Sequence, residues 1–160
     1  MMGFGPQGYH MSRLRCSAPA SLPGSTVSVM VGDMGMTSMM GGVAPLAKRM
    51  MMLRAVPARV PAGQVSFEIG NMGWRTHEMV VLPLAAGRTV GQRAPGQNGR
   101  VDETGSLGEA SASCAAGTGE GTRSGTVGWV TLALPAGRYE LLCNLKNHYA
   151  NGMYQELAVS

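Results

Sequence analysis

The sequence is poor in charged and aromatic residues: Asp, Glu, Lys and Arg make up 14% of its 160 residues, and Phe, Trp and Tyr make up 5%. The formal charge of +4 is mild and the basic residues are scattered, which gives nucleic-acid binding little support. No run of about twenty apolar residues is present, so no transmembrane helix is predicted. With only three histidines, one chain also cannot build a metal centre that needs many histidines.

Glycine and proline are abundant instead, with 24 and 9 residues. A chain of this length with short apolar segments and many Gly and Pro turns is typical of one all-β domain, a sandwich or a barrel. In the segment 63–82, Val65, Phe67 and Ile69 alternate with Ser66, Glu68 and Gly70, which predicts a half-buried strand. A turn at 71–73 and a second apolar run follow. His77 should therefore lie beside a turn at one end of the domain.

The C-terminal segment carries Cys143, His148 and Met153, with four residues between each and the next. One Cys and two His with a weak axial Met form the trigonal site that holds copper for electron transfer. His77 is the upstream candidate for the fourth ligand. Zinc competes for Cys and two His, but a structural zinc site needs four strong ligands and Met is a poor fourth.

These segments resemble the cupredoxins, the small blue copper proteins, in the branch that includes rusticyanin and sulfocyanin. The resemblance covers about residues 26–160 and depends on four motifs, which are Val60–Phe67, Thr76–Leu82, Pro135–Cys143 and the Cys-x4-His-x4-Met loop that ends at Met153. It implies a Greek-key β-sandwich with a long inserted loop. It also implies that His77, Cys143 and His148 are the equatorial ligands of one copper ion, with Met153 as the axial ligand.

The expected function is therefore transfer of single electrons between redox partner proteins by a mononuclear type 1 (blue) copper site. A single Cys in the loop excludes a dinuclear centre, since two are needed to bridge two metals. No open coordination position is expected, so the protein is predicted not to be an enzyme. His148, at the expected surface edge, is predicted to be the exit for the electron. A monomer is expected, and the resemblance implies an extracytoplasmic protein, although no leader is visible.

Two polar residues follow the ligands and are candidates to support them. A metal-bound His usually donates its second ring N–H to a carbonyl, a carboxylate or water. In cupredoxins, a polar residue after each ligand commonly ties the His strand to the Cys strand, and Glu78 and Asn144 occupy these positions. Glu78 departs from the Asn or Asp that the family more often has there.

Two regions lie outside the ligand motifs. Residues 1–24 are predicted to be a flexible N-terminal arm before a domain at 25–160. Cys16 and Cys114 either form a disulfide or remain unpaired, and the sequence does not decide between these alternatives. The segment of about 85–125 is a long insertion, in which residues 100–110 could form a short helical turn. It either covers the copper end, or forms a docking surface for a redox partner, or is a surface excursion that closes one sheet edge, and we favour the last of these.

A methionine-rich segment lies at 30–52. Thioethers select Cu(I) over harder cations, so Met34, Met36, Met39 and Met40 form a candidate second copper site. Methionines also fill gaps in a core, and the alternating Val27, Val29 and Val31 just before them predict a strand against which some could pack. The alternative function is accordingly storage or delivery of Cu(I) by this segment.

Overall fold

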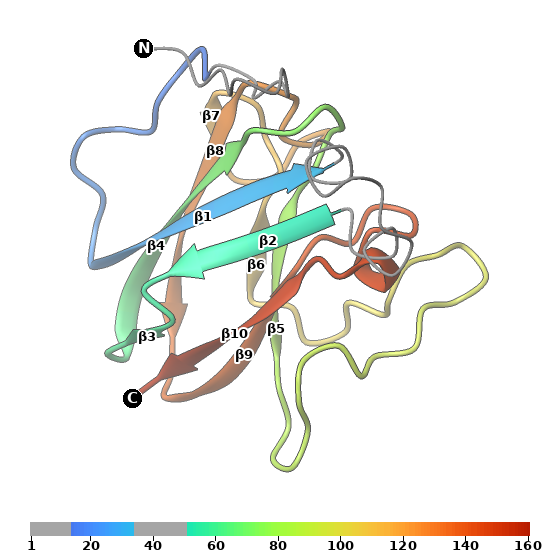
Figure 1. Cartoon of the computed structure of the whole chain (residues 1–160). Helices are drawn as coiled ribbons and strands as arrows, with labels where there is room; N and C mark the ends of the chain where they lie inside the picture. Colours follow the sequence, from blue (N-terminus) through green and yellow to red (C-terminus); the bar gives the residue numbers. More distant parts are fainter. Residues whose placement is uncertain (1–13, 34–50) are drawn as a thin grey trace, which may run out of the picture.

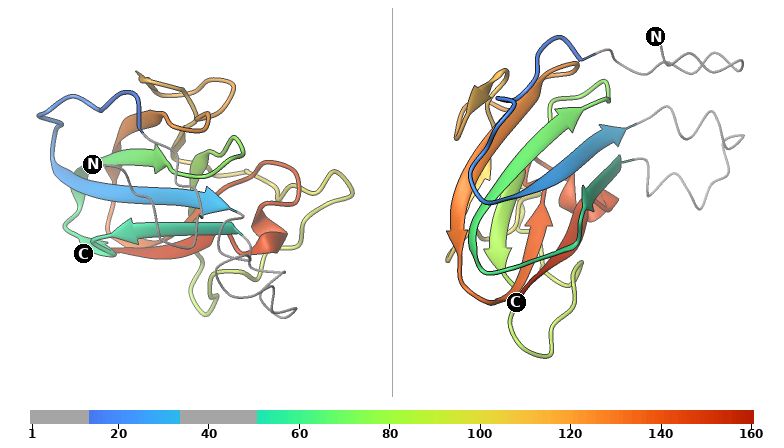
Figure 2. Two further views of the ribbon diagram at one scale, coloured as in Figure 1. Left: turned by 45° about the horizontal axis from the view of Figure 1, so that its top comes forward. Right: turned by 90° about the vertical axis from the view of Figure 1, so that its left-hand side faces the viewer.

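The computed structural model describes residues 14–33 and 51–160. These residues form two five-stranded sheets that face each other as a sandwich, with one short 3-10 helix, η1 (Figures 1 and 2). The strands are β1 (Ser25–Asp33), β2 (Met51–Val56), β3 (Arg59–Val60), β4 (Gly63–Asn71), β5 (Met79–Pro83), β6 (Gly108–Ala110), β7 (Ala115–Ala116), β8 (Val127–Leu134), β9 (Gly137–Leu142) and β10 (Tyr154–Val159), and η1 spans Tyr149–Asn151. The predicted all-β sandwich is confirmed.

Both sheets are mixed. The first has the strand order β2-β1-β4-β8-β7, and the second has the order β3-β10-β9-β5-β6. In the first sheet β1 runs parallel to β4, with Val31 opposite Asn71. In the second sheet β9 lies between β5 and β10. This topology brings the end of β1, the turn after β4 and the loop between β9 and β10 to the same end of the sandwich, away from the C-terminus (Figure 1).

Alternating side chains of the first sheet supply much of the core. Val65, Phe67 and Ile69 of β4 are fully buried, and so is Val27 of β1, with Val29 2% exposed. The predicted strands in both segments are confirmed, because one face of each packs against the second sheet. Met51 of β2 packs against the same core, so packing accounts for this methionine of the segment 30–52.

The insertion at 85–125 adds edge strands to both sheets. Its strand β6 pairs with β5, and β7 pairs with β8. The expected helical turn at 100–110 was wrong: the segment contains a turn at Thr104 and Gly105, followed by β6. The Asp102 carboxylate accepts hydrogen bonds from the backbone and the hydroxyl of Thr104. Such local bonds compete with helix formation.

The described part of the N-terminal arm follows the domain closely. Cys16 and Cys114 form a disulfide with an S–S distance of 2.08 Å, which decides between the two alternatives. Arg15 N–H donates to the Gly125 carbonyl at 2.7 Å, and the Ser66 hydroxyl donates to the Pro23 carbonyl at 2.6 Å. Residues 1–13 of the arm lie outside the described residues. Within the described part of the chain, no helix is long and apolar enough to cross a membrane.

Candidate metal centre

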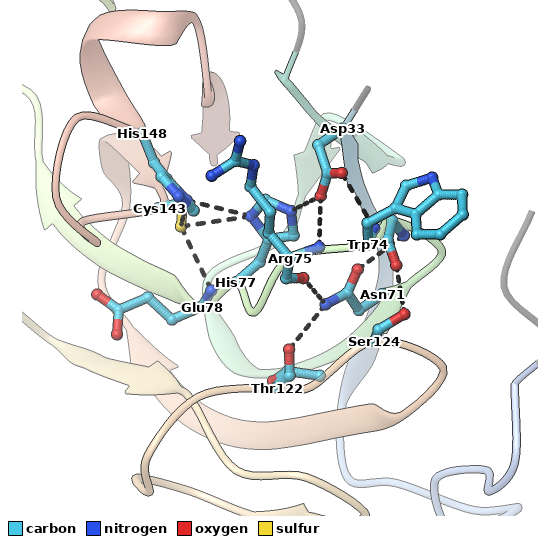
Figure 3. Close-up of polar contacts among 11 residues, drawn as sticks. Asp33, Asn71, Trp74, Arg75, His77, Glu78, Thr122, Ser124, Cys143 and His148 are labelled. Carbon is cyan, nitrogen blue, oxygen red and sulfur yellow. Dashed lines mark hydrogen bonds and ion pairs between the residues drawn. The ribbon is translucent and has the colours of Figure 1, made fainter. Parts of the chain in front are cut away.

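The fold brings together three side chains that are far apart in the sequence: His77, Cys143 and His148. His77 and Cys143 are fully buried, and His148 is 7% exposed. The Nδ1 atoms of the two histidines lie 3.2 Å apart, and Cys143 Sγ lies 3.2 Å from Nδ1 of His148 and 3.9 Å from Nδ1 of His77 (Figure 3). One sulfur and two nitrogens therefore form a small, buried triangle.

This triangle has the size that a metal ion requires. Bonds of about 2.0–2.3 Å, the lengths that zinc makes to imidazole nitrogen and thiolate sulfur, put three trigonal ligand atoms about 3.5–3.9 Å apart. The three observed separations lie within a few tenths of an ångström of that range. Thiolate with two imidazoles is also the donor set of trigonal copper sites. The residues present thus fit a copper ion in both spacing and chemistry.

His77 is held at both backbone groups. It lies between β4 and β5, where its N–H donates to the Thr122 carbonyl at 3.1 Å and its carbonyl accepts from Thr122 N–H at 2.8 Å. The turn before it is fixed by Asn71, whose side-chain amide donates to the carbonyls of Arg75 and Thr122. The amide oxygen of Asn71 accepts from Gly73 N–H. The insertion therefore positions this candidate ligand.

Asp33, at the end of β1, contacts the other nitrogen of the His77 ring. Its Oδ2 lies 2.6 Å from Nε2 of His77, and both side chains are fully buried. The carboxylate also accepts the backbone N–H groups of Trp74 and Arg75, each at 3.0 Å (Figure 3). Burial raises the pKa of Asp33, but the bonds from Arg75, His77 and Trp74 outweigh it and lower the pKa overall. An ionised Asp33 accepts the Nε2 proton, which leaves Nδ1 free to bind a metal.

Cys143 directly follows β9 and faces the His strand. Its backbone N–H donates to the Met153 carbonyl at 3.1 Å, and its sulfur accepts from Glu78 N–H at 3.4 Å. Burial raises the pKa of the Cys143 thiol to about 12. Without a metal the thiol therefore keeps its proton at neutral pH, and a bound metal would displace that proton.

His148 lies in the loop between β9 and β10, immediately before η1. Its N–H donates to the Leu145 carbonyl, and its own carbonyl accepts from Met153 N–H at 3.3 Å. Burial, with the nearby His77 and Arg75, lowers the pKa of His148 to about 4. Burial also lowers the pKa of His77. Both imidazoles are thus neutral at pH 7, which is the form that binds metals.

Met153 begins the return of the loop toward β10 and is fully buried in the same apolar cluster as Cys143. Its two backbone bonds, to Cys143 and to His148, tie it to both of these residues. The other candidate copper ligands, Met34, Met36, Met39 and Met40, lie outside the described residues.

The two residues that follow the ligands, Glu78 and Asn144, contact each other across the strands, and the Asn144 side chain also contacts the insertion. Glu78 is 8% exposed. Burial, with the charges of Glu109 and Glu103, raises the pKa of its carboxyl group to about 7. A hydrogen bond from the backbone of Asn144 acts in the opposite direction. The Asn144 side chain binds the insertion: it accepts from Val101 N–H at 2.8 Å and donates to the Val101 carbonyl and to Glu103.

A buried carboxylate, Glu140, contacts the loop between β9 and β10 and was not predicted from the sequence. Glu140 is fully buried on β9, and its carboxylate accepts from Gly91 N–H, the Arg93 guanidinium and the Tyr149 hydroxyl at 2.7–2.8 Å. Tyr149 also accepts from Arg93 N–H at 3.1 Å. Because Tyr149 follows His148, these bonds anchor the ligand loop to the insertion. The available signal in the sequence was a single Glu among the apolar residues of β9, which indicates a buried carboxylate that needs hydrogen-bond donors.

Several solved structures share this fold. Rusticyanin from Thiobacillus ferrooxidans matches with a TM-score of 0.51 and 15% identity, over 90% of this chain and 86% of rusticyanin. Reduced rusticyanin matches with a TM-score of 0.50 and 15% identity, over 92% of this chain and 90% of that one. Auracyanin B matches with a TM-score of 0.51 and 19% identity, over 94% of this chain and 99% of auracyanin B. No protein-family model and no curated protein sequence matches the chain. The chain has the cupredoxin fold, as the sequence motifs predicted.

Proposed function

We propose that the protein carries single electrons by means of one type 1 copper ion held by His77, Cys143 and His148, with Met153 as a weak fourth ligand. The observation that carries this proposal is the buried triangle of one sulfur and two imidazole nitrogens. When bound, copper supplies a one-electron couple between Cu(I) and Cu(II). A carrier is favoured over an enzyme because the three side chains are 0–7% exposed, which leaves little access for a substrate.

The chain's own residues would keep the site in one geometry. Asp33 fixes the tautomer and the ring orientation of His77, and the Glu78 N–H stabilises negative charge on the Cys143 sulfur. The Tyr149–Glu140 bond holds the loop that contains His148. Because these contacts do not depend on the metal's charge, they support a site that changes little between oxidation states.

The route out of the site and the setting of the protein are parts of the same proposal. His148, at 7% exposed against 0% for His77 and Cys143, is the ligand through which we expect electrons to leave. The disulfide between Cys16 and Cys114 supports an oxidising, extracytoplasmic compartment. The partners would be one-electron redox proteins, and we expect the carrier to act as a monomer.

The visible absorption spectrum of the Cu(II)-loaded protein tests the ligand set. The parent should show an intense thiolate-to-copper band that Cys143→Ser removes. The matched control is the double variant Cys16→Ser, Cys114→Ser, which should retain the band because those sulfurs are joined in the disulfide. A colourless parent would overturn the proposal and favour the alternative of Cu(I) storage by the segment 30–52.

A further inference from the structure

Trp74 is the most exposed large apolar side chain in the described part of the chain, at 60%. It lies three residues before His77 in the turn between β4 and β5. Its backbone N–H donates to Oδ1 of Asp33 at 3.0 Å, and Oδ2 of the same carboxylate lies 2.6 Å from Nε2 of His77. Two hydrogen bonds through one buried side chain thus connect an exposed indole residue to a candidate ligand. Figure 3 shows the indole on the side of His77 away from His148.

The surface around Trp74 is built from three segments that are bonded together. The Ser124 hydroxyl donates to the Gly73 carbonyl at 2.5 Å, and the Arg15 guanidinium donates to the Ser124 carbonyl at 3.0 Å. Gly125 N–H donates to the Asn71 carbonyl at 2.9 Å. Residue 15, the turn 71–76 and the loop 121–126 therefore form one surface.

All charged side chains in those three segments are basic: Arg15, Arg75 and Arg123. Each of them is exposed. The charge of Arg75 also reaches the site, because it contributes to the lowered pKa of both histidines after the larger effect of burial on each. An exposed aromatic residue that shares a surface with exposed arginines has the composition of a protein-docking surface, in which Trp and Arg are enriched. Figure 3 shows the guanidinium of Arg75 on the His148 side of His77, opposite the indole of Trp74.

We propose that this surface, Trp74 with Arg15, Arg75 and Arg123, docks a one-electron carrier protein with an acidic surface and passes electrons to the metal through Asp33 and His77. The inference rests on the proposed function. In the transfer step a reduced partner loses one electron and Cu(II) gains it to become Cu(I), with no bond made or broken; the reverse step returns it. The protein would then have two electron ports, this one at His77 and the other at His148.

The acidic character of the partner follows from charge complementarity. Opposite charges across an interface raise the association rate by steering, and the effect falls as salt screens it. Three arginines at one surface attract a partner rich in carboxylates and repel a basic one. The surface should therefore distinguish two partners that differ in charge alone.

Native and succinylated cytochrome c are such a pair, because succinylation replaces lysine charges with carboxylates on the same haem protein. Stopped-flow rates with the copper-loaded protein should be at least tenfold higher for the succinylated form at low salt. In the triple variant Arg15→Gln, Arg75→Gln, Arg123→Gln, that rate should fall at least fivefold. The control variant Arg54→Gln, Arg59→Gln, Arg88→Gln removes the same charge elsewhere and should lose less than twofold. Equal losses in the two triple variants would overturn the docking surface.

Trp74→Leu tests the port itself, with Trp129→Leu on β8 as the matched control. Trp74→Leu should slow electron exchange with succinylated cytochrome c at least threefold. Trp129→Leu should exchange electrons at the rate of the parent. A smaller loss would overturn the role of Trp74. The blue band and the copper content, measured on each variant, separate this outcome from failure of the proposed function: loss of the band in the parent refutes the copper site, whereas an intact band with unchanged rates refutes the port alone.

Discussion

Asp33→Asn is predicted to weaken copper binding by about 10–100-fold, the usual effect of losing the partner of a metal-bound His. The Asp33 carboxylate accepts from three donors, namely His77 Nε2 and the N–H groups of Trp74 and Arg75. An Asn amide keeps one acceptor oxygen and replaces the other with an NH2 donor. That donor must face either the His77 ring proton or the Trp74 N–H, and the negative charge is lost in both cases.

The magnitude can be checked by a second route. A hydrogen bond to a charged group contributes about 1.5–3 kcal/mol. A change of 10–100-fold in a binding constant corresponds to about 1.4–2.7 kcal/mol. The two ranges agree, so the loss of one hydrogen bond to a charged group is large enough to account for the predicted change in affinity. The metal-free protein should also lose about 1–3 kcal/mol of unfolding free energy, because one buried donor is left without an acceptor.

Competition with a chelator of known affinity measures the binding constant, and denaturant unfolding of the metal-free protein measures stability. Asp102→Asn is the matched control: Asp102 also accepts a backbone N–H, but in an exposed turn of the insertion. Its copper affinity should equal that of the parent. If Asp33→Asn binds copper within threefold of the parent, the orientation of His77 does not depend on Asp33 and the reasoning is refuted.

Three further predictions follow from other contacts. Because burial raises the pKa of Cys143 to about 12 and lowers the pKa of both histidines, Cu(II) binding at pH 7 should release one proton, from the thiol alone, and affinity should rise about tenfold per pH unit; a pH indicator in weak buffer measures this, and no release would contradict it. The double variant Cys16→Ser, Cys114→Ser opens a loop of 98 residues and should lose about 4–5 kcal/mol of unfolding free energy, measured by denaturant unfolding. A loss under about 1 kcal/mol would contradict this prediction. Tyr149→Phe should lose about 1–2 kcal/mol because the Arg93 N–H then lacks its acceptor, with the blue band kept; unchanged stability would show that the bond contributes little.

The local parts of this architecture were predictable from the sequence. Alternation of Val65, Phe67 and Ile69 predicted a strand because one face of β4 is buried. The spacing of Cys143 and His148 predicted a shared site because both lie in one short loop. His77 could be added because the cupredoxin motif around it is itself continuous in the sequence.

Long-range contacts were not predictable in the same way. Asp33 lies 44 residues before His77, and only the parallel pairing of β1 with β4 brings the two together. Its position within the methionine-rich segment 30–52 gave no sign of this role. The partner of Cys16 depended on how residues 14–24 follow the sandwich. The turn at Asp102 was mistaken for a helix because its side chain bonds to the local backbone, which a pattern of polar residues does not distinguish from a helix cap.

Potentiometric titration of the copper-loaded protein, followed at its visible band, tests the central claim most directly. The account predicts one copper per chain and a reversible one-electron transition in which the band bleaches on reduction and returns fully on reoxidation. Loss of copper on reduction, or a band that does not return, would contradict an electron carrier built on His77, Cys143 and His148.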